Sequence, residues 1–177
     1  MAGLWKLPCI YVIENNHYGM GTSAERAAHN PLFYTRGGII PGIRADGQNV
    51  FLVREVMKYV KEFSIKNGPL FLELMTYRYH GHSMSDPGLT YRTRDEIAEM
   101  RKSRDPIESL KGLILHHKVA EEKELKEMEK GVRKDIDADV EKIHKDPEPP
   151  MKELITDIYV EPTVVRNIEF SNPLYPS

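Results

Sequence analysis

The chain has 177 residues, of which 40% are apolar and 29% are charged, a composition typical of one globular domain with a well-solvated surface. Its net charge of -2 at pH 7 gives no reason to expect nucleic acid or an anionic membrane as a partner. No apolar run is long enough to span a bilayer, and a single cysteine, Cys9, excludes an internal disulfide.

A strand is expected close to the N-terminus, over Cys9–Glu14, where a compact apolar run ends at Asn15 and Asn16. A run of this kind is typical of a parallel strand that is buried on both faces. Neither a secretory signal nor an Arg- and Ser-rich leader precedes it. We therefore expect the chain to begin in mid-fold, so that Met1 need not be a natural initiator.

A short helix and a βαβ unit are expected next. Thr22 and Glu25 have the spacing of a capping box, which predicts the start of a helix. Ile43–Ala45 is predicted to form a short strand, and the helical period of apolar residues over Asn49–Phe63 predicts a helix. Leu70–Thr76 then predicts a second buried strand. This order indicates an α/β fold with a right-handed βαβ unit on a parallel sheet.

The rest of the chain is expected to be helical. Thr93 with Glu96 forms a second capping box, and Asp105 with Pro106 marks another helix start. A later helix carries one apolar stripe, made of Leu125, Met128, Val132, Ile136, Val140 and Ile143. Its many charges are expected to form a solvated face. Asp146–Pro150 ends this helix, and a short helix with an extended tail is expected to follow.

Two polar clusters follow the predicted parallel strands, at the strand ends where such sheets bind ligands. In the first, Glu14–Gly21, the side chain of Asn16 and the carbonyl of Tyr18 can point at one cation across a turn. Magnesium prefers hard oxygen ligands of this kind. The alternative is a plain strand-ending turn, because asparagine tolerates the left-handed conformation and caps the backbone locally.

The second cluster, Thr76–Gly88, holds Arg78, His80 and His82 at alternate positions. If the strand geometry persists, the three side chains project to one face and form a surface suited to anions and proton transfer. A metal site and a purely structural role for the histidines are alternatives, although a third metal ligand is missing. Asp86–Gly88 turns the chain, so a loop is predicted here.

Both clusters resemble motifs of one enzyme family. Glu14–Ser23 resembles the end of the thiamine-diphosphate motif, which opens with Gly-Asp-Gly and closes with paired asparagines. Thr76–Gly88, followed by Tyr91–Arg94, is similar to the phosphorylation loop of the pyruvate dehydrogenase alpha subunits, and Asp146–Pro150 fits the same family. The resemblance covers most of the chain but is poor beyond Ile158.

The resemblance implies roles for individual residues. Asn16, through its side chain, and Tyr18, through its carbonyl, would bind the magnesium ion that holds thiamine diphosphate. His82 would be a catalytic and cofactor-binding residue beside the diphosphate, would keep the loop ordered and would assist reductive acetyl transfer. Arg78 would belong to the same anion-binding network.

The resemblance also implies regulation by phosphorylation. Ser83 would be the main inhibitory site and Ser23 the third, while Thr90 stands where the second site is usually a serine. Phosphorylation of Ser83 adds a charge of about -1.5 to -2 beside His82 and an anionic cofactor. We expect the loop to become disordered and to block entry of a lipoyl group. His17 stands where the family more often has arginine.

For the whole protein, the resemblance implies oxidative decarboxylation of pyruvate and reductive acetylation of lipoamide, in the mitochondrial matrix. The partners would be a beta subunit in an α2β2 heterotetramer, the lipoyl domain of dihydrolipoyl acetyltransferase, and a kinase and a phosphatase. Residues 1–92 would be the C-terminal part of the thiamine-diphosphate-binding domain, with the phosphorylation loop at about 77–92. Residues 93–158 would form a helical region and 159–177 an extended tail.

Two other functions remain open. Branched-chain 2-oxoacid dehydrogenase alpha subunits share the fold and the chemistry, although Tyr79–Gly88 favours the pyruvate enzyme. A non-catalytic assembly or regulatory relative would lack the Gly-Asp-Gly half of the cofactor motif, and only 14 residues precede Asn15, none of which forms it. We expect the chain to be the C-terminal part of a longer subunit that, alone, neither holds the cofactor nor decarboxylates pyruvate.

Overall fold

The computed structural model describes residues 1–156 and residue 160, so the predicted tail lies almost wholly outside the described residues. The chain divides into two compact units, Met1–Glu122 and Lys123–Ser177. The domain limits inferred from the family resemblance remain predictions.

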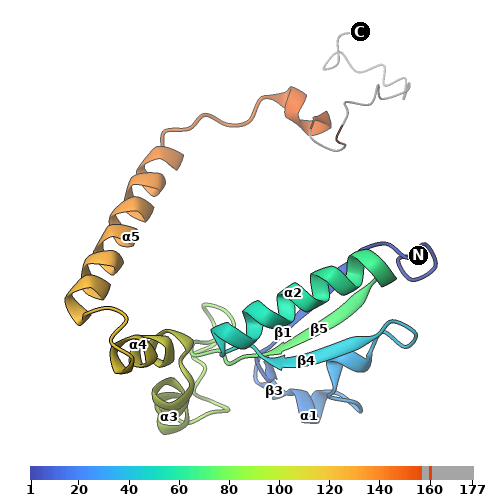
Figure 1. The fold of residues 1–177 in the computed structure, drawn as a ribbon, viewed down its shortest axis with the longest axis horizontal. Helices are drawn as coiled ribbons and strands as arrows, with labels where there is room; N and C mark the ends of the chain where they lie inside the picture. The colour runs from blue at the N-terminus through green and yellow to red at the C-terminus, as the bar shows by residue number, and fades with distance from the viewer. Residues whose placement is uncertain (157–159, 161–177) are drawn as a thin grey trace. The chain divides into compact units, whose positions relative to one another are not determined.

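The first unit is built on a three-stranded parallel sheet (Figure 1). The strand order is β1 (Ile10–Asn15), β5 (Leu70–Met75) and β4 (Gly42–Asp46), with β5 in the centre. Both β1 and β4 run parallel to β5. With helices packed along the sheet, the predicted α/β class is confirmed.

Helix α2 (Val50–Asn67) connects the neighbouring strands β4 and β5 and lies along the sheet (Figure 1). It begins because the Asn49 side chain accepts hydrogen bonds from the amides of Phe51 and Leu52, each at 3.1 Å. It ends at Gly68, whose φ of 102° is in the region that only glycine adopts at little cost. This is the predicted βαβ unit.

The hydrophobic core lies between β5 and α2. Val60 and Leu72 are fully buried and Leu70 is 1% exposed. Partly buried apolar side chains from the three strands and from α2 surround them, namely Ile10, Ile43, Val56, Met57, Phe63 and Leu74. The core therefore stabilises the central strand more than the outer ones.

The expectation that β1 is buried on both faces is wrong. Tyr11 is 40% exposed and Val12 is 47% exposed. Among the described residues β1 has only β5 as a neighbour, so it is an edge strand. Its apolar sequence correctly indicates a parallel strand, but not its place in the sheet.

Short elements fill the chain between β1 and β4, namely β2 (Tyr18–Gly19), β3 (Thr22–Ser23), α1 (Ala24–Ala27) and the 3-10 helix η1 (Phe33–Thr35). Strands β2 and β3 form an antiparallel hairpin. The hydroxyl of Ser23 accepts a hydrogen bond from the Arg26 amide at 3.3 Å. The cap of α1 is thus Ser23, and the prediction that placed it at Thr22 is wrong by one residue, because α1 begins only at Ala24 and the Ser23 hydroxyl lies three residues before the Arg26 amide.

Two helices follow the loop after β5, and both predicted caps are confirmed. Helix α3 (Arg94–Arg104) begins at Thr93, whose hydroxyl accepts from the Glu96 amide at 3.1 Å. Helix α4 (Pro106–His116) begins at Asp105, whose carboxylate accepts from two amides of the first turn. Side-chain caps therefore set both helix starts.

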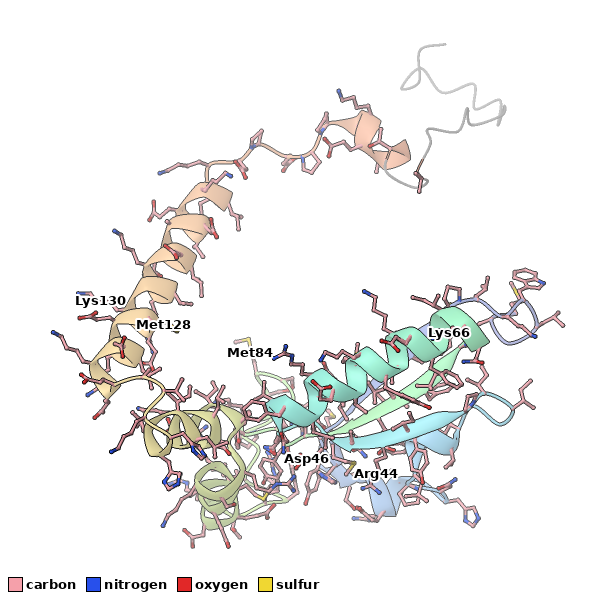
Figure 2. All side chains as sticks on the ribbon, viewed as in Figure 1. Arg44, Asp46, Lys66, Met84, Met128 and Lys130 are labelled. Atoms are coloured by element: carbon pink, nitrogen blue, oxygen red, sulfur yellow. The ribbon has the colours of Figure 1, made fainter. Side chains whose placement is uncertain are left out.

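The second unit contains nearly all of α5 (Glu122–Ile143) and the 3-10 helix η2 (Met151–Ile155). Most of the predicted apolar stripe of α5 is exposed, with Met128 65% and Val132 52% exposed. Figure 2 labels Met128 on this stripe and Lys130 on the charged face. No helix in the described part of the chain is long and apolar enough to cross a membrane.

We expect Leu72→Ala to lower the free energy of unfolding of the first unit by about 3 kcal/mol, because it leaves a cavity between β5 and α2. Val132→Ala on the exposed stripe should change it by less than about 0.5 kcal/mol. Urea unfolding followed by circular dichroism measures both. Equal effects of the two substitutions would contradict this position of the core.

Candidate functional site

The sheet brings the two polar clusters to one edge. Asn15 at the end of β1 and Asp46 at the end of β4 both align with Met75 at the end of β5. The first cluster follows β1 and the second follows β5, so both start where parallel strands end. This is the edge at which such sheets bind ligands.

The first turn is held by Asn15, which is 7% exposed. Its Nδ2 donates to Glu73 Oε1 at 2.6 Å, and its Oδ1 accepts from the His17 amide at 3.0 Å. His17 has a φ of 68°, in the left-handed region that few side chains adopt. The second oxygen of the Glu73 carboxylate accepts from the Tyr34 amide at 3.0 Å. A buried acid in the central strand thus ties β1, η1 and the turn together.

The turn leaves two oxygens of the kind that magnesium binds. The side chain of Asn16 is half-buried and makes no hydrogen bond in the part of the chain that the structure describes. The carbonyl of Tyr18 accepts one long hydrogen bond, from Arg78 Nη1 at 3.4 Å. An amide oxygen and a carbonyl oxygen with spare lone pairs suit part of an octahedral magnesium shell. These two residues therefore fit the ion that the resemblance implies.

The alternation of Arg78, His80 and His82 does not persist as strand geometry. Strand β5 ends at Met75, and no helix or strand is present from 76 to 93. Arg78 Nη1 lies 3.5 Å from His82 Nδ1, so these two side chains do meet. His80 instead contributes its carbonyl, which accepts from Arg78 Nε at 3.2 Å. The predicted loop is present, but its three basic residues are not arranged as one face.

Arg78 joins the two clusters. Its Nη2 donates to the Met20 carbonyl at 2.6 Å and to the Tyr91 hydroxyl at 2.9 Å. With the long bond to the Tyr18 carbonyl, one guanidinium links the hairpin of the first cluster to both ends of the loop. The planar fork of arginine permits this number of donated bonds.

Asp86 fixes the turn of the loop. Its Oδ2 accepts from the His82 amide at 2.8 Å and from the Tyr91 hydroxyl at 2.9 Å, and its Oδ1 accepts from the Gly88 amide at 2.8 Å. These hydrogen bonds, first the one from the His82 amide and then the one from the Gly88 amide, lower the pKa of the Asp86 carboxyl. The folded loop therefore favours the ionised form.

Arg92 lies beneath the loop and is 3% exposed. It donates to the carbonyls of Arg78 and His80. Its guanidinium carbon lies 5.4 Å from the ring centre of Tyr18, and the rings of Tyr77 and Tyr91 are 5.2 and 5.0 Å away. Aromatic faces and carbonyls compensate part of the cost of burying this cation, while its Nε makes no hydrogen bond among the described residues. The sequence indicated Arg92 only as part of a motif.

The three candidate phosphorylation residues have different surroundings. Ser83 and Thr90 are exposed, and the hydroxyl of Ser83 lies 3.1 Å from that of Ser85. Met84, between these serines, projects from the loop (Figure 2). Ser23 is half-buried and its hydroxyl caps α1. Ser83 and Thr90 are thus accessible, whereas Ser23 is partly engaged.

Comparison with known proteins gives the family. The model described as "Dehydrogenase E1 component" matches residues 1–152. The chain belongs to this family. It is 54% identical over 161 residues to "Pyruvate dehydrogenase E1 component subunit alpha, mitochondrial" of Solanum tuberosum, covering 91% of the chain and 41% of the relative.

Two further relatives agree with this family. The corresponding alpha subunit of Dictyostelium discoideum is 48% identical over 177 residues, which cover 99% of the chain and 47% of that protein. The somatic form of Bos taurus is 52% identical over 160 residues, which cover 90% of the chain and 41% of that protein. The chain thus spans less than half the length of these relatives. The resemblance to pyruvate dehydrogenase alpha subunits is confirmed.

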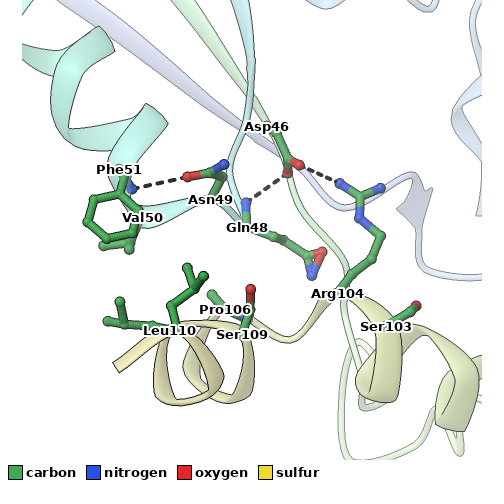
Figure 3. Close-up of a pocket in the computed structure, with 11 residues that line it drawn as sticks. Asp46, Gln48, Asn49, Val50, Phe51, Ser103, Arg104, Pro106, Ser109 and Leu110 are labelled. Carbon is green, nitrogen blue, oxygen red and sulfur yellow. Dashed lines mark hydrogen bonds and ion pairs between the residues drawn. The ribbon is translucent and has the colours of Figure 1, made fainter. Parts of the chain in front are cut away.

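Two pockets of this dehydrogenase E1 chain lie near the same strand ends. One, of about 180 Å³, lies between the start of α2 and the junction of α3 with α4 (Figure 3). Its polar wall includes the ion pair of Asp46 with Arg104 at 2.8 Å, and no predicted site residue lines it. The other, of about 480 Å³, is lined by His17 and Thr76. The second pocket is the more relevant one, because it adjoins both polar clusters.

No group of three His, Cys, Asp or Glu side chains suited to a metal occurs within residues 1–156 or at residue 160. The alternative of a metal held by His80 and His82 has no third ligand there.

We expect Asp86→Asn to loosen the loop, because the amide replaces one acceptor oxygen with a donor that faces backbone amides. Tryptic cleavage after Arg92 should become several-fold faster. The matched change Asp95→Asn, on an exposed residue of α3, should leave the rate unchanged. A loop that resists trypsin equally in both variants would argue against Asp86 as its anchor.

The pKa of Asp86 predicts the pH dependence of the loop. The folded pKa of the Asp86 carboxyl is lowered from its ordinary value. The stabilisation of the loop is therefore complete above the unfolded pKa and is lost as the pH falls through the folded pKa. We expect the amide shift of Gly88, followed by NMR, to titrate with a midpoint below that of an unperturbed aspartate. A midpoint at or above that of an unperturbed aspartate would contradict the hydrogen-bond pattern.

Proposed function

We propose that this chain provides one wall of the thiamine-diphosphate site, and the phosphorylation loop, of a pyruvate dehydrogenase alpha subunit. The single observation that carries the proposal is Arg78, which links the turn of Asn16 and Tyr18 to the loop of His82 and Ser83. The names of the relatives support pyruvate as the substrate of the whole enzyme. That enzyme would decarboxylate pyruvate oxidatively and acetylate lipoamide.

Asn16 and Tyr18 would hold the magnesium ion, with Arg78 nearby as a fixed positive charge for the diphosphate. When bound, thiamine diphosphate supplies the reactive carbon that adds to the substrate carbonyl. The chain's own contribution is to bind and orient the cofactor at the end of the sheet. The remaining ligands of the ion would come from the upstream Gly-Asp-Gly half of the motif.

Arg78 Nη1 lies 3.5 Å from His82 Nδ1. Because a guanidinium only donates, a hydrogen bond between the two would make Nδ1 the acceptor and leave the ring N–H on Nε2. This N–H can donate to the diphosphate or to a lipoyl sulfur during acetyl transfer, which is the role proposed for His82.

Phosphorylation at Ser83 would act on the anchor of the loop. Ser83 lies three residues before Asp86, whose amide donates to the Ser83 carbonyl at 3.1 Å. A phosphate there adds negative charge near the Asp86 carboxylate and can attract Arg78 away from the Met20 carbonyl and the Tyr91 hydroxyl. Both effects disfavour the ordered loop. Thr90 is a second exposed candidate, and Ser23 a third, each without an anchoring contact of this kind.

The proposed partners and location follow from the family. They are a beta subunit in an α2β2 heterotetramer, the lipoyl domain of dihydrolipoyl acetyltransferase, a kinase and a phosphatase. The relatives are named as mitochondrial, and the matrix is the proposed location. Residues 1–92 are proposed as part of the cofactor domain and 93–158 as the helical region.

In the complete enzyme, we expect Asn16→Ala to weaken Mn²⁺ binding in the presence of thiamine diphosphate by about tenfold or more, because a ligand is lost. Electron paramagnetic resonance of Mn²⁺ measures this affinity, and Asn67→Ala at the end of α2 is the control. Unchanged affinity would reject the metal site. Faster turnover of branched-chain 2-oxoacids than of pyruvate would favour the alternative enzyme, and no turnover of either would favour the non-catalytic relative.

We expect Ser83→Glu to slow acetylation of a free lipoyl domain by the complete enzyme much more than it weakens cofactor binding. Ser83→Ala should keep the wild-type rate. The reason is that a negative charge beside Asp86 disorders the loop that the lipoyl group passes. Equal acetylation rates for wild type and Ser83→Glu would remove the regulatory role.

A further inference from the structure

We infer that Glu73 is a positioning residue of the metal-binding turn, acting through Asn15. This inference rests on the proposed magnesium site at Asn16 and Tyr18, but the link between Glu73 and the turn can be tested separately. Neither polar cluster contains Glu73, and no role in the site follows from its position in β5.

The burial of Glu73 requires an explanation. It is fully buried in the central strand, between the core residue Leu72 and Leu74, and it has no ion-pair partner among the described residues. A buried carboxylate is costly unless hydrogen bonds compensate it, and an apolar side chain commonly serves a core as well or better. Packing alone therefore does not account for an acid here.

The two carboxylate oxygens of Glu73 are used by donors from distant segments. Oε1 accepts from Asn15 Nδ2 at 2.6 Å, and Oε2 accepts from the Tyr34 amide at 3.0 Å. Because both oxygens accept from N–H groups, the Asn15 amide turns its NH₂ group, and not its oxygen, towards β5.

The orientation of Asn15 then sets the turn. With its NH₂ group on Glu73, its Oδ1 must face the His17 amide, from which it accepts at 3.0 Å. A reversed amide would place a donor against that N–H. The hydrogen bond to Oδ1 holds His17 at a φ of 68°, and His17 separates Asn16 from Tyr18. Glu73 thus determines where the two proposed metal ligands lie.

Substitutions at Asn15 and Glu73 can disrupt this hydrogen-bond pattern singly and restore it in combination. In Glu73→Gln, one oxygen is left for two donors. The Tyr34 backbone N–H cannot reverse its direction, so the oxygen stays with it, and the introduced NH₂ group faces the NH₂ group of Asn15. In Asn15→Asp, two carboxylates face each other. In the double variant Asn15→Asp/Glu73→Gln, the introduced glutamine donates to the introduced aspartate and accepts from the Tyr34 amide. The introduced aspartate still accepts from the His17 amide, and the net charge of the pair is that of the wild type.

Two measurements on these variants test the inference. In the 177-residue chain, the amide hydrogen of His17 should exchange several-fold faster in each single variant, and near the wild-type rate in the double variant. In the complete enzyme with thiamine diphosphate, the Mn²⁺ dissociation constant should rise about tenfold or more in each single variant. It should return to within about threefold of wild type in the double variant. Glu62→Gln, the same change on the exposed side of α2, is the control.

Two outcomes would overturn the inference. One is a single variant that loses stability while keeping the wild-type Mn²⁺ affinity and His17 exchange, since Glu73 would then be only a core residue. The other is a folded double variant that recovers neither property. If a single variant does not fold, the double variant tests the inference: recovery of His17 exchange and Mn²⁺ affinity supports it, and failure to recover either property overturns it. Failure of the magnesium site itself is distinguishable, because Asn16→Ala would then leave Mn²⁺ affinity unchanged while His17 exchange still responds to Glu73.

Discussion

A carboxylate that has lost all contact with water must be surrounded by donors from its own chain, and this constraint organises the sheet edge. Glu73 meets it with donors that lie 58 and 39 residues away in the sequence. The central strand, the edge strand and η1 are therefore tied at one point. The cost of burying this polar group is offset only when all three segments are in place, so the geometry of the turn after β1 depends on the assembly of the whole sheet.

The loop after β5 is ordered by a different kind of interaction. It has no backbone ladder, and its conformation depends on Asp86 as an acceptor and on Arg78 and Arg92 as donors to backbone carbonyls. Arg78 extends this network to the hairpin after β1. The turn after β1 and the loop after β5 are consequently parts of one hydrogen-bonded surface, although each arises from a separate strand.

The sequence predicted the elements that depend on local patterns. The βαβ unit, the caps at Thr93 and Asp105 and the loop after residue 76 follow from periodicity and from side chains three residues apart. Predictions failed where contacts with distant segments determine the structure. Examples are the exposure of the edge strand β1 and the one-residue shift of the α1 cap. Glu73 and Arg92 were not singled out, because their partners are carbonyls, amides and rings that only the folded chain brings near. A lone acid inside the apolar strand Leu70–Met75 was the one available signal.

Because residues 76 to 93 form no helix or strand, opening of this loop and unfolding of the sheet are separate equilibria. Opening of this loop breaks a few side-chain hydrogen bonds and exposes little of the core around Val60 and Leu72, so its free energy of opening is a local quantity. A chemical change at the loop can then shift the ordered population by orders of magnitude while the melting temperature of the sheet hardly moves. Measurements of global stability would not detect such a change.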